Sequence, residues 1–247
     1  LQNKVAIVTG AGSGIGRAIA IIYAREGAKV VVSDISEKGG EETVAQIKAA
    51  QGEAVFIKAD TSSAADNESL VQKTKEKYGA LHIACNNAGI SGPMGQTGDY
   101  PIEGWDKVIG INLSGVFYGM HYQIPEMLKA GGGAIINMAS ILGNTGTKFS
   151  PAYVAAKHGV VGLTKAAALE YANQGIRINS VGPGYIVTPL LTNALNEEQI
   201  QGAAALHPIG RLGQPEEVAE LVLFLSTQQS SFITGSYYPV DGGYLAQ

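Results

Sequence analysis

A tyrosine and a lysine four positions apart, Tyr153 and Lys157, are the residues of this sequence best suited to move a proton. The small and apolar residues around them predict a helix over 151–173, on which positions four apart share one face. An ammonium beside a phenol favours the phenolate. We therefore expect Lys157 to lower the pKa of Tyr153 from its usual value near ~10. A phenol tuned in this way is suited to general acid/base catalysis.

Ser140 provides a hydroxyl for the same chemistry. It follows the apolar run 134–139, which predicts a strand, and ligands of open α/β sheets bind at the carboxyl ends of strands. We expect Ser140 to hydrogen-bond a substrate oxygen and hold it against the phenol of Tyr153. A Tyr-x-x-x-Lys pair alone is better explained as an exposed helix face, so the interpretation depends on whether the rest of the chain supplies a partner for the proton.

Short β-rich runs alternate with helical patterns along the whole chain. Strands are predicted over 5–8, 30–34, 54–59, 81–85, 134–139, 176–181 and 237–240. Helices are predicted over 17–26, 36–50, 64–78, 103–129 (bent or ended near Pro125), 151–173 and 215–226. This alternation predicts right-handed βαβ units and an α/β fold: one doubly wound (Rossmann) parallel sheet flanked by helices, in a single domain over 1–247. The longest irregular region, 184–214, is expected to be a substrate lid.

Composition excludes several classes of protein. The chain has 247 residues, of which 45% are hydrophobic and 15% charged, as in a globular protein. A net charge of -4 without a basic block argues against nucleic acid. No apolar run has membrane-spanning length and residues 1–5 lack a signal-peptide pattern, so we expect no membrane association and a cytoplasmic location. The single Cys85 excludes an internal disulfide, and the four histidines lack metal-ligand spacing, so no metal is expected.

A glycine-rich turn follows the first predicted strand and reads T-G-x-x-x-G-x-G. Glycine lets the backbone approach a pyrophosphate, and the N-terminus of the following helix attracts the anion. A tight connection between a strand and a helix would need similar glycines, so the turn alone is weak evidence for a cofactor. The residues of the turn that we expect to contact a cofactor are Gly10, Ser13, Gly14, Ile15 and Gly16.

Asp34 ends the second predicted strand, where a carboxylate can accept hydrogen bonds from both ribose hydroxyls. The same carboxylate would repel a 2′-phosphate, and Ile35 beside it supplies no positive charge. NAD (NADH) is therefore favoured over NADP. A strand-end turn or a helix cap is the alternative role for Asp34. At the next strand end, Asp60 and Thr61 are placed to bound the adenine, with N-capping an equal alternative.

In this order, the motifs resemble those of the short-chain dehydrogenase/reductase family over essentially the whole chain. The glycine turn is similar to the cofactor loop of that family, and the Asn-Asn-Ala-Gly sequence at 86–89 is similar to its fourth-strand motif. Pro183-Gly184 with Thr188 is similar to the segment that closes over the nicotinamide. Beyond the turn and Asp34, the cofactor contacts we expect are Asn87, Ala88, Gly89, Tyr153, Lys157, Pro183, Gly184, Ile186 and Thr188.

The resemblance also implies a catalytic group formed by Asn112, Ser140, Tyr153 and Lys157. Tyr153 would protonate a carbonyl oxygen in reduction or deprotonate an alcohol in oxidation, and Ser140 would position that oxygen. Lys157 would hold the nicotinamide ribose and lower the pKa of Tyr153. Asn112 would hold a water in a proton relay to Lys157, although an Asn in a helical pattern can instead cap or kink the helix. The family commonly forms tetramers through the helix at 151–173 and its neighbour, so a homotetramer is implied.

The residues around the proposed site are mostly apolar, without an Arg or Lys placed to hold a carboxylate or a phosphate. They favour a small secondary alcohol or its ketone over a phosphorylated or acyl-carrier substrate. The substrate contacts we expect are Ser140, Leu142, Tyr153, Tyr185 and Leu191. The flanking residues Ile141, Ile186, Leu190 and Leu195 belong to the same apolar set, and Met94 and Gln96 are placed to reach it. Packing of a lid is an equal alternative for several of the leucines.

The favoured interpretation is an NAD(H)-dependent oxidoreductase that interconverts a secondary alcohol and its ketone. One alternative is a dinucleotide-binding regulatory protein that kept the fold and lost turnover, against which the intact Ser140, Tyr153 and Lys157 argue. A methyltransferase also pairs a glycine loop with an acidic strand end, but it gives no reason for the Tyr–Lys pair.

Overall fold

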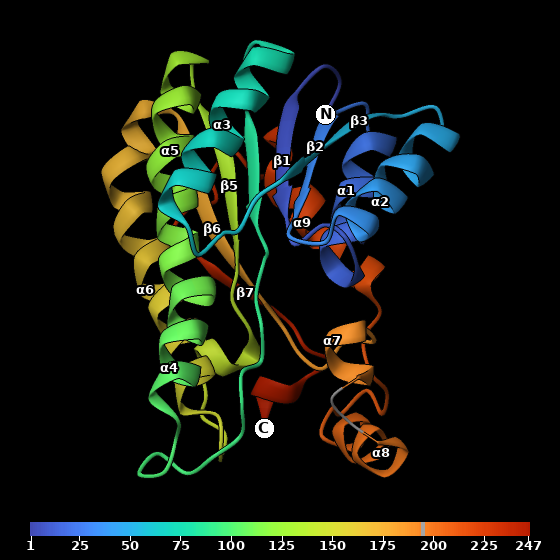
Figure 1. Cartoon of the computed structure of the whole chain (residues 1–247), viewed down its shortest axis with the longest axis vertical. Coiled ribbons are helices and arrows are strands. Elements are labelled where there is room, and N and C mark those ends of the chain that lie inside the picture. Colours follow the sequence, from blue (N-terminus) through green and yellow to red (C-terminus); the bar gives the residue numbers. More distant parts are fainter. Residues whose placement is uncertain (194–195) are drawn as a thin grey trace.

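The computed structural model of the chain describes residues 1–193 and 196–247, and in them seven parallel strands form one sheet (Figure 1). The sheet order is β3-β2-β1-β4-β5-β6-β7. The strands are β1 (Val5–Thr9), β2 (Lys29–Asp34), β3 (Glu53–Lys58), β4 (Ile83–Asn86), β5 (Gly133–Met138), β6 (Ile176–Pro183) and β7 (Tyr237–Val240). The predicted doubly wound parallel sheet is confirmed.

Helices cover both faces of this sheet (Figure 1). One face carries α1 (Gly14–Arg25), α2 (Glu37–Ala49) and α9 (Pro215–Ser226). The other carries α3 (Ala64–Tyr78), α5 (Gly115–Lys129) and α6 (Pro151–Tyr171). The shorter helices α4 (Ile102–Ile109), α7 (Pro189–Thr192) and α8 (Glu197–Ala205) lie toward the carboxyl ends of the strands. Among the described residues, no helix is both long and apolar enough to cross a bilayer.

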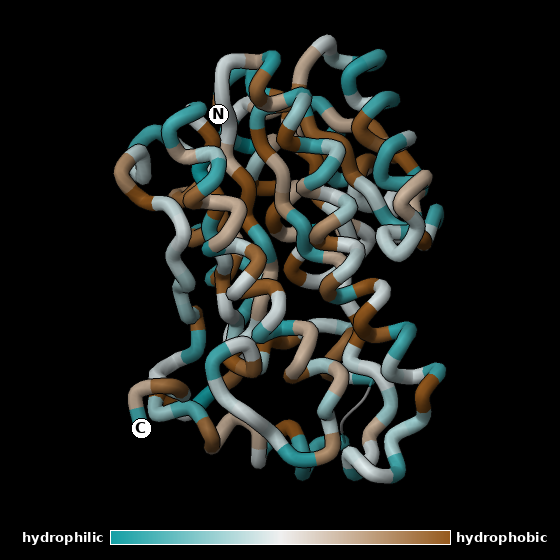
Figure 2. Tube along the Cα trace, turned by 90° about the vertical axis from the view of Figure 1, so that its left-hand side faces the viewer, coloured by the Kyte–Doolittle hydropathy of each residue, from teal (hydrophilic) through white to brown (hydrophobic). Residues whose placement is uncertain are grey.

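The strands are apolar on both faces because each face is covered by helices. In β1, Ala6 and Val8 pack with α1 and α9, whereas Ile7 between them packs with α3 and α5. All three side chains are fully buried. Figure 2 shows the apolar stretches of the strands running through the interior between more polar helices. Because successive side chains of a strand point to opposite faces of the sheet, the same strands contribute to two separate hydrophobic cores.

The order of the strands reverses at β1, which pairs with β2 on one side and with β4 on the other. The turn after β1 runs into α1, and the segment after β4 carries the Asn-Asn-Ala-Gly motif. In open α/β sheets a ligand crevice forms at such a reversal, outside the carboxyl ends of the strands. The glycine turn and the motif at 86–89 therefore lie at the same crevice.

Two of the predicted elements differ from the structure. The helical stretch at 103–129 does not end at Pro125, which lies inside α5 on its exposed face, where the carbonyl that lacks an amide partner can bond to water. The stretch is instead interrupted by a π-helical turn at Gly110–Ser114. The region 184–214 is not wholly irregular. It contains α7 and α8, and α8 begins at a capping box in which Asn196 and Gln199 bond reciprocally.

A buried polar network fixes α5 and α6 to the centre of the sheet. Asn86 of β4 donates to Asn137 of β5 at 3.0 Å and exchanges two hydrogen bonds with Gln123 of α5. Asn137 in turn donates to Thr164 of α6 at 3.0 Å. All four side chains are buried. Because buried amides must find partners, this network specifies how the two helices meet the strands.

We expect Asn137→Leu to lower the free energy of unfolding by about 3 kcal/mol, because one buried N–H of Asn86 and the buried hydroxyl oxygen of Thr164 each lose a hydrogen bond. Urea unfolding at fixed protein concentration measures this loss. The matched control is Asn173→Leu at an exposed position, which we expect to cost less than about 0.5 kcal/mol. A loss below about 1 kcal/mol for Asn137→Leu would show that the network contributes little.

Candidate active site

The glycine turn after β1 is tightly packed against the end of β4. A Cβ atom at Gly10, which has φ +62, would lie 2.9 Å from the Cα atom of Ala88. A Cβ atom at Gly16 would collide with the carbonyl of Gly10 and lie 2.5 Å from Nδ2 of Asn87. These two glycines are therefore required by the packing of the protein itself, as well as by any approach of a ligand.

Thr9 joins the turn to the motif after β4. Its Oγ1 accepts hydrogen bonds from the backbone N–H groups of Asn87 at 3.0 Å and Ala88 at 3.2 Å. The Asn87 side chain donates back to the Thr9 carbonyl at 2.9 Å. Asn87 and Ala88, both predicted cofactor contacts, are thereby fixed beside Gly10.

Asp34 lies at the end of β2 and faces the glycine turn. Its Oδ2 accepts from the N–H of Gly12 at 2.9 Å, and its Oδ1 accepts from the N–H of Ser36 at 2.8 Å. The carboxylate therefore stabilises the turn, as the alternative interpretation proposed. Each carboxylate oxygen has a further lone pair, so the group retains capacity to accept ribose hydroxyls. The guanidinium of Arg17 nearby bonds to Thr43, Glu42 and two backbone carbonyls.

The segment after β6 faces the glycine turn from the other side. A Cβ atom at Gly14, which has φ +53, would lie 3.1 Å from Cγ2 of Thr188. Ser13 is the N-cap residue of α1, and its exposed hydroxyl makes no capping bond. The first turn of α1 is thus open to an anion, with Thr188 across from it.

Three predicted cofactor residues make contacts inside the protein. The side chain of Ile186 is buried in the core on the α1 and α9 side of the sheet. Asp60 accepts from the N–H and hydroxyl of Ser62 and so forms the turn before α3, whose N-cap residue is Ser63. Thr61 is buried and its carbonyl accepts from Asn67. The N-capping role that was the alternative for Asp60 and Thr61 belongs instead to Ser63, whose side chain accepts from the N–H of Asp66.

The proposed catalytic side chains of α6 lie at the carboxyl end of β5. Lys157 is buried and donates from Nζ to the carbonyl oxygen of Met138 at 2.7 Å. The same Nζ atom is 5.5 Å from the centre of the Tyr153 ring, as the spacing of four on a helix predicts. A Cβ atom at Gly89 would lie 3.3 Å from Oδ1 of Asn112 and 3.7 Å from Nζ of Lys157. Gly89, Asn112 and Lys157 therefore meet at one point.

Asn112 is fully buried in the π-helical turn between α4 and α5. Its Oδ1 accepts from the N–H of Ile90 at 2.9 Å, and its Nδ2 donates to the Ile90 carbonyl at 2.8 Å. The amide thus fixes the chain immediately after Gly89 and retains one donor and one lone pair. Single π-helical turns inside helices are frequent at functional sites, and here the turn carries the predicted residue.

Ser140 follows β5 in extended backbone. Its Oγ accepts from the N–H of Leu142 at 3.2 Å, and its carbonyl accepts from the Tyr237 hydroxyl at 2.9 Å. The Ser140 hydroxyl lowers the pKa of Tyr153, which puts the two side chains in the same neighbourhood. Ser140, Tyr153 and Lys157 are therefore gathered at one edge of the sheet. Tyr237 was assigned no role from the sequence, because its contact with Ser140 joins residues 97 positions apart.

The protonation of the Tyr–Lys pair differs from the prediction. Burial raises the pKa of Tyr153, the Ser140 hydroxyl lowers it, and the nearby Tyr185 phenol raises it. Burial also lowers the pKa of Lys157 to about 8. The pKa of Tyr153 is therefore raised, and not lowered as expected, in the protein alone, because removal from water disfavours the phenolate.

The other residues expected to contact the substrate differ in exposure. Leu142, Tyr185 and Leu191 are partly exposed, whereas Ile141 is buried in the core and Leu190 and Met94 are exposed. Leu195 lies outside the described residues. His207 was assigned no role from the sequence, yet it is buried against Tyr185.

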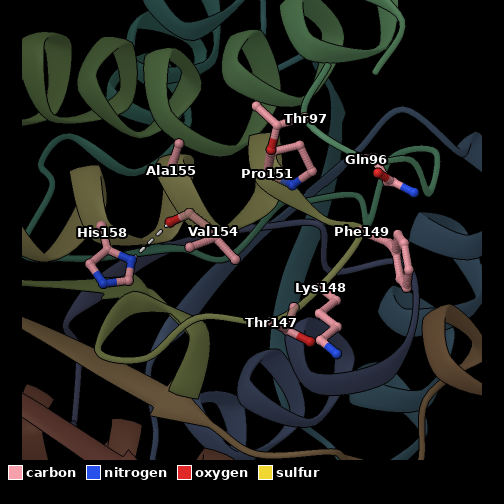
Figure 3. Close-up of a pocket in the computed structure, with 9 residues that line it drawn as sticks. All are labelled: Gln96, Thr97, Thr147, Lys148, Phe149, Pro151, Val154, Ala155 and His158. Atoms are coloured by element: carbon pink, nitrogen blue, oxygen red, sulfur yellow. Dashed lines mark hydrogen bonds between the residues drawn. The ribbon is translucent and has the colours of Figure 1, made fainter. Parts of the chain in front are cut away.

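A cavity of about 620 Å³ lies on the other face of α6 (Figure 3). Its α6 residues are Pro151, Val154, Ala155 and His158, and Gln96 and Phe149 line it as well. Their spacing of three and four puts them on one helical face, which is not the face of Tyr153 and Lys157. Gln96, expected near the substrate, therefore lines a cavity separate from the proton-transfer groups.

Comparison with known proteins gives one family for this arrangement. Residues 10–245 match the family model described as enoyl-(acyl carrier protein) reductase. Cyclohexanol dehydrogenase of Acinetobacter sp. (strain SE19) is 54% identical over 246 residues, which cover 100% of this chain and 96% of that protein. Cis-4-hydroxycyclohexanecarboxylate dehydrogenase of Sinomonas cyclohexanicum is 41% identical over 244 residues, covering 99% and 97%.

A solved structure agrees with these sequence matches. The crystal structure of levodione reductase superposes with a TM-score of 0.97 at 37% identity, covering 100% of this chain and 99% of that one. The matches extend over the sheet, the glycine turn and the helix that carries Tyr153 and Lys157. The chain therefore belongs to the short-chain dehydrogenase/reductase family of oxidoreductases.

Proposed function

We propose that this protein is an NAD(H)-dependent dehydrogenase that interconverts a secondary alcohol on a saturated ring and the corresponding ketone. The observation that carries the proposal is the convergence of Ser140, Tyr153 and Lys157 beside the crevice at the β1–β4 reversal. The ring is suggested by the names of relatives that match over almost their full length, which act on cyclohexanol and on a hydroxycyclohexanecarboxylate. A regulatory protein without turnover would not need three proton-handling groups at this edge.

The family uses a nicotinamide dinucleotide, and the residues at the crevice fit one. We propose that the pyrophosphate binds the first turn of α1, between Ser13 and Thr188, and that Asp34 accepts from the adenosine ribose. Lys157 donates one N–H to Met138, which leaves further donors for the nicotinamide ribose. When bound, the cofactor supplies hydride transfer to or from the carbinol carbon.

The protein handles the proton. In ketone reduction Tyr153 donates its phenolic proton to the carbonyl oxygen, and in alcohol oxidation its phenolate accepts the hydroxyl proton. Ser140 holds the substrate oxygen in reach of the phenol. We propose that the free donor and lone pair of Asn112 hold a water that exchanges protons with Lys157.

The proposal includes a lid and an assembly. Region 184–214 begins with Gly184, and Thr188 faces the glycine turn, so we propose that this region closes over the bound cofactor and alcohol.

We further propose a homotetramer in which α5 and α6 contact their counterparts. The exposed Phe117 of α5 and Leu169 of α6 give these helices an apolar outer surface.

Removal of the proposed acid/base group is the direct test of this function. We expect Tyr153→Phe to lower kcat/KM for cyclohexanol by about 10³-fold, because general acid/base catalysis contributes roughly that much, while the Kd for NADH changes little. The matched control is Tyr78→Phe, since the Tyr78 hydroxyl has no partner among the described residues and lies outside the site. A wild type and a Tyr153→Phe variant that bind NADH and are equally inert would favour the regulatory protein.

Cofactor preference tests the role of Asp34. We expect NADH to exceed NADPH in kcat/KM by at least about tenfold, or ~1.4 kcal/mol, because the carboxylate repels a 2′-phosphate. Asp34→Asn should reduce this preference, whereas Asp106→Asn makes the same change in net charge on the exposed face of α4 and should leave it unchanged. Equal use of the two cofactors by the wild type would contradict the assignment.

The pH dependence follows from the raised pKa of Tyr153. Below its pKa the phenolate fraction rises about tenfold per pH unit. Alcohol oxidation, which needs the phenolate, should therefore become up to about 100-fold faster from about pH 7 to about pH 9, whereas ketone reduction should not. Initial rates in both directions with saturating cofactor measure the two profiles. An oxidation rate that falls over this interval would show that another group controls the proton.

A further inference from the structure

We propose that His207 is a positioning residue that holds Tyr185 as a wall of the substrate pocket, and that Tyr244 extends this wall. The inference rests on the proposed function, and it assigns residues that select the alcohol rather than residues that transfer the proton. The three rings come from segments far apart in the sequence: Tyr185 follows β6, His207 follows α8, and Tyr244 follows β7.

The rings form one cluster. Those of Tyr185 and His207 are 5.7 Å apart and nearly perpendicular, at 86°. Those of His207 and Tyr244 are also 5.7 Å apart, and those of Tyr185 and Tyr244 are 6.3 Å apart. Edge-to-face contacts at these distances are favourable. His207 is only 3% exposed, whereas both tyrosines remain partly exposed and can contact a ligand.

Both nitrogens of His207 have backbone partners, which fixes the orientation of the ring. Nε2 lies 3.2 Å from the backbone nitrogen of Tyr185, which can only donate, so Nε2 is the acceptor. Nδ1 then carries the hydrogen and donates to the Ala203 carbonyl of α8 at 2.9 Å. The imidazole therefore connects Tyr185 directly to the last turn of α8.

The surrounding backbone leaves the imidazole little room. A Cβ atom at Gly184 would lie 2.6 Å from Nε2 of His207. On the opposite side, the Ile209 N–H donates to the Gly242 carbonyl at 3.1 Å, and the Gln247 side chain donates to the Leu206 carbonyl at 3.0 Å. The chain after β7 thus bonds to the backbone before and after His207, and its Tyr244 ring contacts the imidazole.

Tyr185 connects the cluster to the proton-transfer site. The Ala139 N–H donates to the Val181 carbonyl at 2.8 Å, so the segment that leaves β6 toward Tyr185 starts beside Ser140 at the carboxyl end of β5. The Tyr185 phenol also raises the pKa of Tyr153. The exposed part of Tyr185 therefore borders the space in which an alcohol must lie to reach Tyr153. A planar aromatic surface offers an alicyclic ring a large apolar contact and no charge. The position of that surface depends on the hydrogen bond from the Tyr185 N–H to His207.

A double-mutant cycle on the whole enzyme tests this inference. We expect His207→Leu, which removes the acceptor, to raise KM for cyclohexanol at least about tenfold with kcat within about threefold and an unchanged Kd for NADH. His207→Gln keeps an oxygen that can accept from Tyr185 and should restore most of the loss. In a Tyr185→Ala background, His207→Leu should change KM by less than about twofold, because the residue through which it acts is gone.

A second measurement does not depend on turnover. Hydrogen exchange of the peptide at 184–188 should accelerate at least about tenfold in His207→Leu, because the Tyr185 amide loses its acceptor. His82→Leu is the matched control. His82 accepts the Val5 N–H at 3.0 Å at the amino ends of β1 and β4, so its loss should change neither KM nor exchange at 184–188.

The outcomes separate the two proposals. If His207→Leu raised KM by the same factor in the wild type and in Tyr185→Ala, the positioning role would be overturned. Exchange at 184–188 that does not respond to His207→Leu would overturn it as well. A wild type that oxidises no secondary alcohol, combined with faster exchange in His207→Leu, would overturn the proposed function and support the role of His207 in holding Tyr185. Should His207→Leu fail to fold, His207→Phe, which keeps a ring but removes the acceptor, replaces it in the cycle and in the exchange measurement with the same expected outcomes.

Discussion

The arrangement of this molecule depends on the lack of space between the turn after β1 and the end of β4. The glycines of the turn have no room for a side chain against Asn87 and Ala88, and the Thr9 hydroxyl joins the two segments. Because β1 is the strand at which the sheet order reverses, this contact closes the bottom of the crevice. The groups proposed to bind a dinucleotide and those proposed to move a proton then meet across it.

The sheet and its helices could be predicted because their signals are local. Strands covered on both faces are apolar throughout, and a glycine follows several of the helices. The π-helical turn could not be predicted, since Asn112 is held there by hydrogen bonds to Ile90, 22 positions earlier. The capping box of Asn196 and Gln199 is a local signal that sequence analysis could have found, and it would have placed α8 inside the region expected to be irregular.

The catalytic group could be proposed from spacing, but its electrostatics could not. Tyr153 and Lys157 meet because positions four apart on a helix always do. The direction of their pKa shifts instead follows from burial, which depends on how α6 packs against β5 and on the Met138 carbonyl that holds Nζ. Contacts such as those of Tyr237 with Ser140 and of His207 with Tyr185 likewise join distant segments and leave no periodic pattern in the sequence.

The two sides of the crevice are built in different ways, and this difference bears on specificity. The proposed proton-transfer groups lie on α6 and at the end of β5. The buried amides of Asn86 and Asn137 link β4, β5 and α6 to one another. The proposed substrate side consists of the loop segments that follow β6, α8 and β7, and these segments meet at His207. Residues in connections can change without disturbing a core. On the proposed function, such a chain can therefore change its substrate while the position of Tyr153 stays fixed.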